Sequence, residues 1–422
     1  MGAEHFFTPS FDVRLSDIIP EKPNTPYAFY RYNSGARAAG NFAATWERVG
    51  SDETLLAGQG YAFRGAETPV INAKGGVSKQ WTGLHHVWNA EQDGTNYFLT
   101  KDEITLPLSH YNGEFAHNRN WNFIGNPYPA YLDIRGVDYD GPMYIYNSDS
   151  WDRKWYAVSA LDDEYVIDPM AAIFVQAADG VNNITFLPNR RQHIKKFVKD
   201  EEASGTRAMR RAQKNRYRTV YNISLANADA VGSENTEGES PKALASTRLV
   251  INPTATASYE IGRDLPMMNM SSTADAEQMS AELYTLGGGV SYAINERPLG
   301  DGVVFLGVRL PSAGTYTLSL SVKQNANGSA AQEDIYLIDN EENTRTLISD
   351  GESYTFTANA GTSTSRFVLA FGEANPTSVD NEEWSMVNGQ WSSSLTYNLQ
   401  GLPVSIPSRG VYIRAGKKIV IK

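Results

Sequence analysis

The sequence contains no cysteine among its 422 residues. Disulfide bonds, thiolate metal sites and cysteine nucleophiles are therefore excluded together. The chain also lacks an apolar run of the roughly 18 residues that a membrane-spanning helix needs. Its opening residues, MGAEH, have neither the basic start nor the apolar core of a signal peptide. If the protein is exported, we expect its signal to lie outside this chain.

Catalytic motifs and excess positive charge are also missing. The formal net charge of -11 and the pI of about 5.2 make the average surface repel polyphosphates, which argues against nucleic acid and acidic glycans as partners. There is no GxSxG, no P-loop and no GxGxxG opening a helix, and the glycines at 287–289 lie between β segments. The sequence therefore does not predict an enzyme. The remaining alternative is a glycosidase-like carboxylate pair, whose members meet only in the fold.

Short β segments separated by Gly, Pro, Asn and Asp dominate the chain. Hydrophobic residues make up 41% of it, and 23 Tyr and 8 Trp favour sheets. Many short strands without helical crossovers predict an all-β fold of two tandem antiparallel, jelly-roll-like β-sandwich domains with a short C-terminal β-hairpin tail. The predicted boundaries are 1–190 and 217–375 for the sandwiches, 191–216 for a charged linker, and 376–422 for a polar connector and the tail.

One corner of the first domain has an unusual composition. The stretch RNWNFIGNPYPAYLDI at 119–134 couples a strand to a turn in which two prolines fix the backbone and restrict the residues before them. In its order of segments this region resembles large secreted proteins of Bacteroidetes, with GNPYP followed by YIY at 144–146. The second domain resembles the companion module of those proteins through YEIGRD at 259–264, LYT at 283–285 and LGVRLPSAGTYTLSL at 306–320. Such modules are known as parts of surface proteins and bring no catalytic residues. An alternative for the corner is a rigid turn with no ligand.

The last 26 residues, 397–422, read as short β segments with Gly and Pro turns. YNLQG at 397–401, RGVYI at 409–413 and GKKIVIK at 416–422 resemble the C-terminal sorting tail of proteins exported by the type IX secretion route. This resemblance implies a secreted or outer-surface location and a tail that engages the secretion machinery. A plain terminal hairpin is the alternative.

Aromatic residues beside acidic and amide groups are the candidates for ligand binding. Trp151, Asp152, Trp155 and Tyr156 form the best patch, because aromatic rings stack on the CH faces of sugars while polar neighbours bond the hydroxyls. Trp81 and Trp88 form a second one. The alternative is that these tryptophans are core residues of the sandwich.

Metal binding has little support. His85 and His86 are adjacent, so in a strand they point to opposite faces and do not chelate one ion, and His110 and His117 add no recognised spacing. No cofactor is predicted, although Asp138, Asp140 and the acidic run at 162–164 offer carboxylate oxygens for a structural calcium ion; a solvated acidic surface is the alternative.

The basic segment RRQHIKKFVKDEEASGTRAMRRAQKNRYR, at 190–218, interrupts the β pattern and is expected to be partly helical or disordered. A phosphate-bearing surface and a solvated linker are its two interpretations. Two functions remain for the whole chain: a non-catalytic structural or adhesive portion of a surface protein, or a carbohydrate-binding module for a polysaccharide or host surface glycan.

Overall fold

The computed structural model describes most of both halves of the chain. It covers residues 4–20, 26–65, 68–69, 83–86, 94–97, 100–147, 154–197, 206–228, 243–268, 280–323, 334–348, 350–372 and 374, together with the strands at 384–387, 390–393, 396–397, 410–414 and 417–421. The structure is 52% strand and 10% helix. The prediction of a β-rich chain is confirmed.

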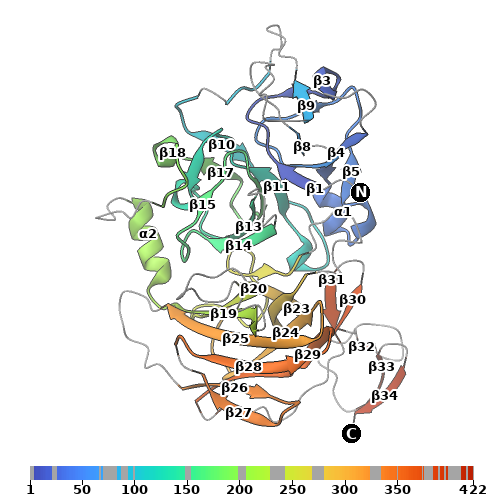
Figure 1. The fold of residues 1–422 in the computed structure, drawn as a ribbon, viewed down its shortest axis with the longest axis vertical. Coiled ribbons are helices and arrows are strands. Elements are labelled where there is room, and N and C mark those ends of the chain that lie inside the picture. Colours follow the sequence, from blue (N-terminus) through green and yellow to red (C-terminus); the bar gives the residue numbers. More distant parts are fainter. Residues whose placement is uncertain are drawn as a thin grey trace. The chain divides into compact units, whose positions relative to one another are not determined.

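The chain divides into two compact units. Unit 1 comprises Met1–Asn215 and Glu260–Leu265, and unit 2 comprises Arg216–Tyr259 and Pro266–Lys422. Most of the segment predicted as a linker thus belongs to unit 1. It contains helix α2, Thr206–Asn215, the longer of the two α-helices in the described residues (Figure 1).

Unit 1 contains two antiparallel four-stranded sheets. The first has the order β1-β7-β4-β5, with bounds Glu4–Phe7, Tyr61–Gly65, Tyr27–Tyr32 and Trp46–Arg48. The second has the order β11-β16-β13-β14, with bounds Trp121–Gly125, Ala172–Gln176, Pro142–Asn147 and Lys154–Ser159.

Smaller strands and single turns complete this unit. The strands are β2 Val13–Arg14, β3 Ile18–Pro20, β6 Thr54–Leu55, β8 Thr68–Pro69, β9 Gly83–His86, β10 Ile104–Pro107, β12 Tyr131–Asp133, β15 Val166–Ile167, β17 Asn183–Phe186 and β18 Arg191–Gln192. The helical turns are α1 Ser34–Ala38, η1 Leu15–Asp17, η2 Phe42–Ala44, η3 Ala116–Asn118, η4 Ile134–Gly136 and η5 Pro188–Arg190.

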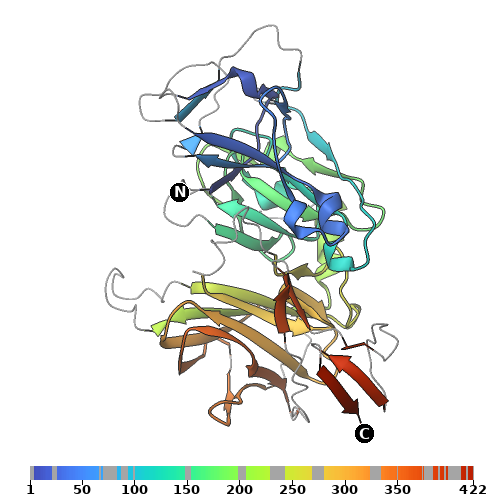
Figure 2. The same cartoon turned by 90° about the vertical axis from the view of Figure 1, so that its right-hand side faces the viewer.

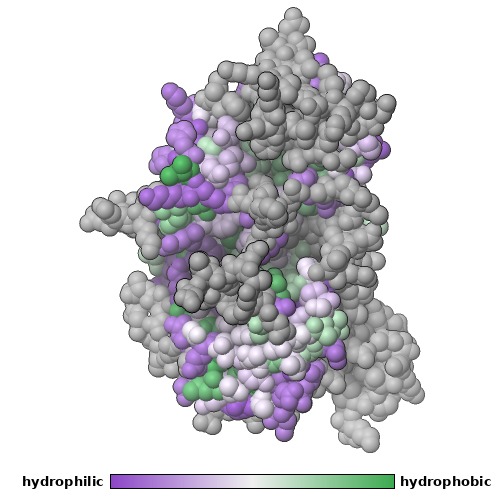
Figure 3. Space-filling model, viewed as in Figure 1, coloured by the Kyte–Doolittle hydropathy of each residue, from purple (hydrophilic) through white to green (hydrophobic). Residues whose placement is uncertain are grey.

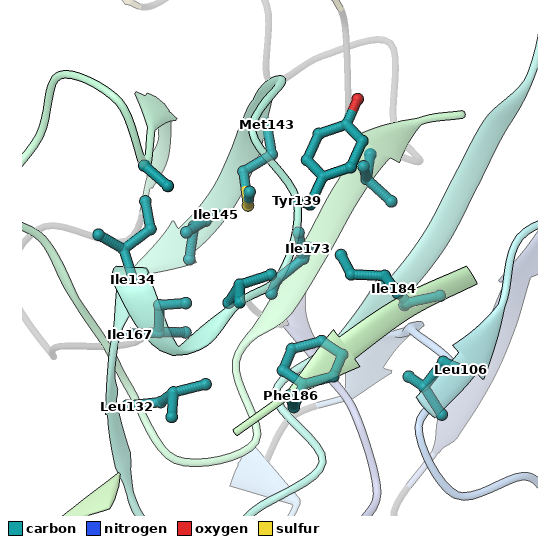
Figure 4. Packing of buried hydrophobic residues seen from close by; sticks show 14 of the residues in the cluster. Leu106, Leu132, Ile134, Tyr139, Met143, Ile145, Ile167, Ile173, Ile184 and Phe186 are labelled. Atoms are coloured by element: carbon teal, nitrogen blue, oxygen red, sulfur yellow. The ribbon is translucent and has the colours of Figure 1, made fainter. Parts of the chain in front are cut away.

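The second sheet is apolar on both faces. Its strands alternate aliphatic and aromatic residues, so one face is aliphatic and the other is aromatic, and both are buried. In β13, Met143 and Ile145 join an aliphatic core, whereas Tyr146 makes ring contacts on the opposite side. The aliphatic core also takes residues from η4, β10 and β17, including Ile134, Leu106 and Phe186 (Figure 4). Period-two patterning therefore sets which face of the sheet meets which partner.

The aromatic side of this sheet meets the first sheet. Phe6 of β1 lies 5.1 Å from the ring of Tyr146, and Tyr32 of β4 lies 4.7 Å from that of Phe174. Trp46 of β5 meets Phe123 edge-to-face at 5.5 Å. These residues, with Trp121 and Trp155, form what we call the aromatic layer of unit 1. Edge-to-face and tilted contacts of this kind add to the energy of burial.

Unit 2 is built on one nearly closed, barrel-like sheet of ten strands (Figures 1 and 2). Its order is β27-β26-β29-β24-β22-β23-β20-β19-β25-β28. The bounds are β19 Thr219–Asn227, β20 Ala243–Ile251, β22 Glu282–Gly287, β23 Val290–Arg297, β24 Val303–Leu310, β25 Gly314–Lys323, β26 Ile335–Asp339, β27 Thr344–Leu347, β28 Ser353–Ala358 and β29 Gly361–Phe371.

One pairing in this sheet differs from the expectation. β20 and β23 run parallel, with Leu249 opposite Asn295, and β8 and β9 of unit 1 are also parallel, so the prediction of purely antiparallel sheets is wrong in both units. A parallel pair needs a connection that returns the chain to the same end of the sheet, and local turn signals do not reveal such a return. Inward residues such as Ile223, Leu318 and Leu369 fill the interior.

The remaining strands are short. β21 spans Leu265–Pro266, and β30 Trp384–Val387 pairs with β31 Gln390–Ser393. β32 Thr396–Tyr397, β33 Gly410–Arg414 and β34 Lys417–Ile421 form a three-stranded antiparallel sheet. The antiparallel β33–β34 pair lies within residues 397–422.

Candidate functional site

Only part of the predicted aromatic patch is described by the structure. Trp81, Trp88, Trp151 and Asp152 lie outside the described residues, and Trp155 and Tyr156 are the second and third residues of strand β14. The structure therefore places two of the six candidate residues.

Trp155 lies in the aromatic layer and is half-buried. Its ring lies 5.0 Å from that of Phe6, 5.2 Å from Phe174 and 5.3 Å from Tyr146. Its indole Nε1 is buried and has no hydrogen-bond partner among the described residues. A buried donor without a partner costs free energy, which marks this position as one that packing alone does not explain.

Tyr156 points to the other face of the same sheet, as alternation along a strand requires. It packs against the aliphatic core, 6.0 Å from the ring of Tyr165, with Lys154 Nζ 5.0 Å from its own ring centre. Trp155 and Tyr156 are thus not brought together on one surface.

The histidines are not brought together as a metal site. His85 and His86 are neighbours in β9, paired with Ile19 and Ile18 respectively. A ring nitrogen of His110 lies 3.1 Å from the carbonyl of Val181. No group of three potential metal-ligating side chains is found in the part of the chain that the structure describes.

His117 has an unusual environment. Burial, aided by the nearby positive charge of Arg37, lowers its pKa to about 4, so the ring is neutral at pH 7. Arg37 itself is only 2% exposed, lies 5.3 Å from the ring of Trp121 and donates to Tyr32 Oη at 3.3 Å. Its Nε and Nη2 atoms have no hydrogen-bond partner in the described ranges. This is a cation held by aromatic faces.

The GNPYP corner is internally satisfied. Asn126, fully buried, accepts from the backbone N–H of Tyr128 at 3.1 Å and donates to the carbonyls of Ala130 and Asp168 at 2.9 and 3.0 Å. Tyr128 Oη lies 2.8 Å from the carbonyl of Phe186, and burial raises the pKa of this tyrosine to about 12. These side chains stabilise backbone groups that no strand partner satisfies. This agrees with the rigid-turn interpretation.

The asparagines of RNWN act in the same way. Asn122 accepts from the backbone N–H of Ser109 at 2.8 Å and donates to its carbonyl at 3.0 Å. Asn120 accepts from the backbone N–H of Tyr111 at 2.8 Å. Each amide side chain replaces a strand partner for a loop segment.

Ion pairs with carboxylates hold the basic segment against the rest of unit 1. Arg210 Nε, Arg211 Nε and Lys214 Nζ of α2 lie 2.8, 3.2 and 3.1 Å from the carboxylate of Asp140, and Arg210 Nη2 lies 2.7 Å from that of Asp138. Burial raises the pKa of Asp140, but the charge and hydrogen bonds of the three cations outweigh it and lower the pKa below its ordinary value.

Two further buried aspartates face the same segment. Asp168 pairs with Lys195 at 2.9 Å, and Asp133 lies 3.9 Å from Arg190. The predicted solvated acidic surface is therefore wrong for Asp138 and Asp140. Their carboxylate oxygens bind the cations of α2. The sequence does not reveal these contacts, because the aspartates and the cations are some 70 positions apart.

Sequence reasoning missed the main buried ion pair of unit 2. Arg366 of β29 donates from Nε and Nη2 to the carboxylate of Asp339, at 2.9 to 3.1 Å, and both residues are buried. The guanidinium lies 4.9 Å from the ring of Phe356. Tyr354 Oη donates to Asp339 Oδ2 at 3.1 Å, which links the edge strand β28 to β26. We call this group the seam cluster, because β27 and β28 are the two edges of the nearly closed sheet.

No helix among the described residues is long and apolar enough to span a membrane. Residues 267–371, which include the seam cluster, match a family model described as a domain of unknown function, DUF8693. The searches of curated proteins and of solved structures found no match.

Proposed function

We propose that this chain is a non-catalytic structural or adhesive portion of a secreted or surface-anchored bacterial protein. In this proposal the two units are tandem sandwich-like modules of the kind found in Bacteroidetes surface proteins, and residues 397–422 are a type IX sorting tail. One observation carries the structural role. The polar side chains of the GNPYP corner, Asn126 and Tyr128, form hydrogen bonds within unit 1. The donors and acceptors used in these bonds are not available to a substrate.

The charged groups support the same proposal. Asp140 is neutralised by α2 and Asp339 by Arg366, and each of these pairs stabilises its own unit. A general acid or base needs a proton that it exchanges with a bound substrate, usually at a pKa tuned toward the working pH. A carboxylate held ionised by a bidentate arginine is poorly suited to that task.

Export tests the location part of this proposal. The chain is produced behind a periplasmic signal in a Bacteroidetes host, with and without residues 397–422, and in a strain that lacks the type IX machinery. We expect protease-accessible protein on intact cells only when both the tail and the machinery are present. Equal surface exposure of the tail-less protein would refute the sorting role. A scrambled tail of the same composition is the control.

A carbohydrate-binding module is the second candidate. It is favoured by the half-buried ring of Trp155, which is close in sequence to Trp151 and Asp152. A glycan panel tests it with a Trp151→Ala/Trp155→Phe variant, where phenylalanine retains packing in the aromatic layer. The exposed Tyr217→Ala is the matched control. Binding lost in the tryptophan variant alone would establish this function.

A further inference from the structure

One arginine of unit 1 is buried although no carboxylate of the described residues pairs with it. Charged side chains normally lie at the surface, and Figure 3 shows strongly hydrophilic residues over the described parts of both units. Arg37, the fourth residue of α1, is instead only 2% exposed. A buried charge is costly unless an opposite charge and hydrogen bonds offset the loss of water. The surroundings of Arg37 show what could supply that opposite charge.

The neighbours of this guanidinium are aromatic and neutral. Its Cζ lies 5.3 Å from the ring centre of Trp121 and 5.8 Å from that of Phe42, and Nη1 donates to Tyr32 Oη at 3.3 Å. Burial raises the pKa of Tyr32, so its phenol is neutral at pH 7. His117 is neutral as well, since burial lowers its pKa to about 4. The ring faces offset part of the cost of burial, but none of these groups carries a negative charge.

The unused donors of Arg37 lie on one edge of the guanidinium. Its Nε and Nη2 atoms are buried and have no hydrogen-bond partner in the part of the chain that the structure describes. In arginine these two nitrogens stand side by side in a rigid, planar fork, with their N–H groups pointing the same way. Such an edge matches the two oxygens of a carboxylate, which it binds through two parallel hydrogen bonds. Tyr32 bonds to Nη1 and leaves this edge unused.

Unit 2 contains the same arrangement with the edge occupied. Nε and Nη2 of Arg366 donate to the carboxylate of Asp339 at 2.9 to 3.1 Å, and the guanidinium lies 4.9 Å from the ring of Phe356. Both arginines are thus buried beside aromatic rings, and they differ in the carboxylate. The pair in unit 2 shows which chemical group completes a buried arginine of this kind.

We propose that Arg37 binds a small carboxylate ion through its Nε–Nη2 edge. The two N–H groups donate to the two carboxylate oxygens, and the nearby rings of Trp121 and Phe42 keep water away from the pair, which strengthens it. Burial limits the size of the ligand. A polysaccharide or a side chain of a protein partner does not reach a residue that is 2% exposed, whereas an ion of the size of formate or acetate enters by local opening of the unit.

This site goes beyond the structural role proposed for the chain, and its test is independent of export. A ligand that binds only the folded unit multiplies its folding equilibrium constant by 1 + [L]/Kd. The purified full chain is titrated at pH 7 with sodium formate or sodium acetate, and sodium chloride replaces the omitted salt so that the ionic strength stays constant. Hydrogen exchange read by mass spectrometry measures the two units separately. We expect protection of the most stable amides of unit 1 to rise about tenfold at about ten times Kd, with unit 2 unchanged.

Three variants locate the binding site. Arg37→Met removes the donors and should abolish the response. Arg37→Lys keeps the charge but loses the planar fork, so we expect its Kd to rise about tenfold or more. The matched control is Arg48→Met, which removes an exposed arginine of β5 in the same unit and should respond like the wild type. Thermal denaturation without added carboxylate verifies that each variant is folded, and Arg37→Lys carries the test if the methionine variant does not fold.

Several results would overturn the proposal. A wild-type chain that gains no protection from either carboxylate lacks the site, and a site that accepts any small anion gives the same result because chloride is present throughout. An undiminished response of the folded Arg37 variants would place the binding elsewhere. Equal protection of both units would indicate a general effect of the salt. The export experiment is unaffected by these outcomes, so failure here is distinguishable from failure of the proposed function.

Discussion

Units 1 and 2 satisfy their buried polar groups in different ways. Unit 1 is assembled from short strands and loops, and buried amide side chains such as Asn122 and Asn126 bond directly to backbone groups. Unit 2 is built mainly on one large sheet, and its buried polar side chains include charge pairs such as Arg366–Asp339 and Arg218–Glu296.

The difference follows from how each unit pairs its backbone. A continuous sheet pairs nearly all of its own backbone N–H and C=O groups. Polar side chains on its outer face are therefore not needed as hydrogen-bond partners for the backbone. Loops have no such partner, and their side chains are used as replacements. Polar residues in unit 1 therefore mostly serve the backbone of loops, whereas the outward polar residues of the unit 2 sheet are not needed for that task.

Two buried arginines, one from each unit, give the sharpest test of this comparison. Arg366→Met would leave Asp339 buried without its cation, which should lower the free energy of unfolding of unit 2 by about 3–5 kcal/mol. Arg37→Met in unit 1 removes a cation that has no carboxylate partner in the described residues, so we expect a change within about 1 kcal/mol. Denaturant titration with hydrogen exchange, which assigns each transition to its unit, measures both.

The double variant Arg366→Met/Asp339→Leu is the control for the seam cluster. Replacing both partners by apolar groups should restore much of the loss, because no unpaired charge remains. An equal cost for Arg37→Met and Arg366→Met would show that both arginines are held by the same kind of interaction, contrary to the geometry.

Asn126→Ala tests whether amide side chains carry the loops of unit 1. The substitution leaves a buried backbone N–H and two buried carbonyls without their partner, and we expect unit 1 to lose about 2–4 kcal/mol while unit 2 is unchanged. The exposed Asn41→Ala is the control and should stay within about 0.5 kcal/mol of the wild type. A mild effect at Asn126 would mean that water replaces its bonds.

A change in pH should separate the units because all six histidines belong to unit 1. The pKa of His117 is about 4 in the folded state, below the ordinary 6.5, so its contribution is complete above pH 6.5. As the pH falls below 6.5 the unfolded chain binds a proton that the folded chain does not, and stability decreases until about pH 4. We expect unit 1 to lose about 2 kcal/mol between pH 6.5 and 5.

His117→Gln is the matched variant for this titration. It should flatten the dependence of unit 1 on pH over that range, while the stability of unit 2 stays level in both proteins. Thermal denaturation at several pH values measures it, and an unchanged slope in the variant would assign the effect to another group.

Much of the fold was predictable because strand patterning is local. Segments such as GPMYIYN and GTYTLSLSV became β13 and β25 close to the expected residues. The order of the strands was not predictable. β20 and β23 pair in parallel, and nothing in the sequence of either segment indicates the other as its partner. Helix α2 formed where a helix or disorder was expected, but its attachment to Asp140 depends on the fold of distant loops.

The candidate site was predictable only in part for the same reason. The prediction grouped Trp155 and Tyr156 in one patch, whereas alternation along β14 places them on opposite faces, and only the fold shows that Trp155 meets Phe6 and Phe174. The outward hydroxyls of β25 and β28 have a local signal, since TYTLSLS at 315–321 and SYTFT at 353–357 carry a hydroxyl at every second position. Only the register shows that Ser224, Ser319 and Ser353 lie in one row.

The smallest expected effect on stability belongs to the outward threonines of β28. Thr355→Val keeps a branched side chain of similar shape on β28, loses one exposed contact with Thr317 and should change the free energy of unfolding by less than about 0.5 kcal/mol. The reason is that the sheet already pairs the backbone and the core is formed by the other side of the strand. The inward Phe356→Ala, one position along, should cost about 3–5 kcal/mol. Denaturant titration of both variants decides the matter, and a large cost at Thr355 would mean that its bond to Thr317 helps to hold the sheet together.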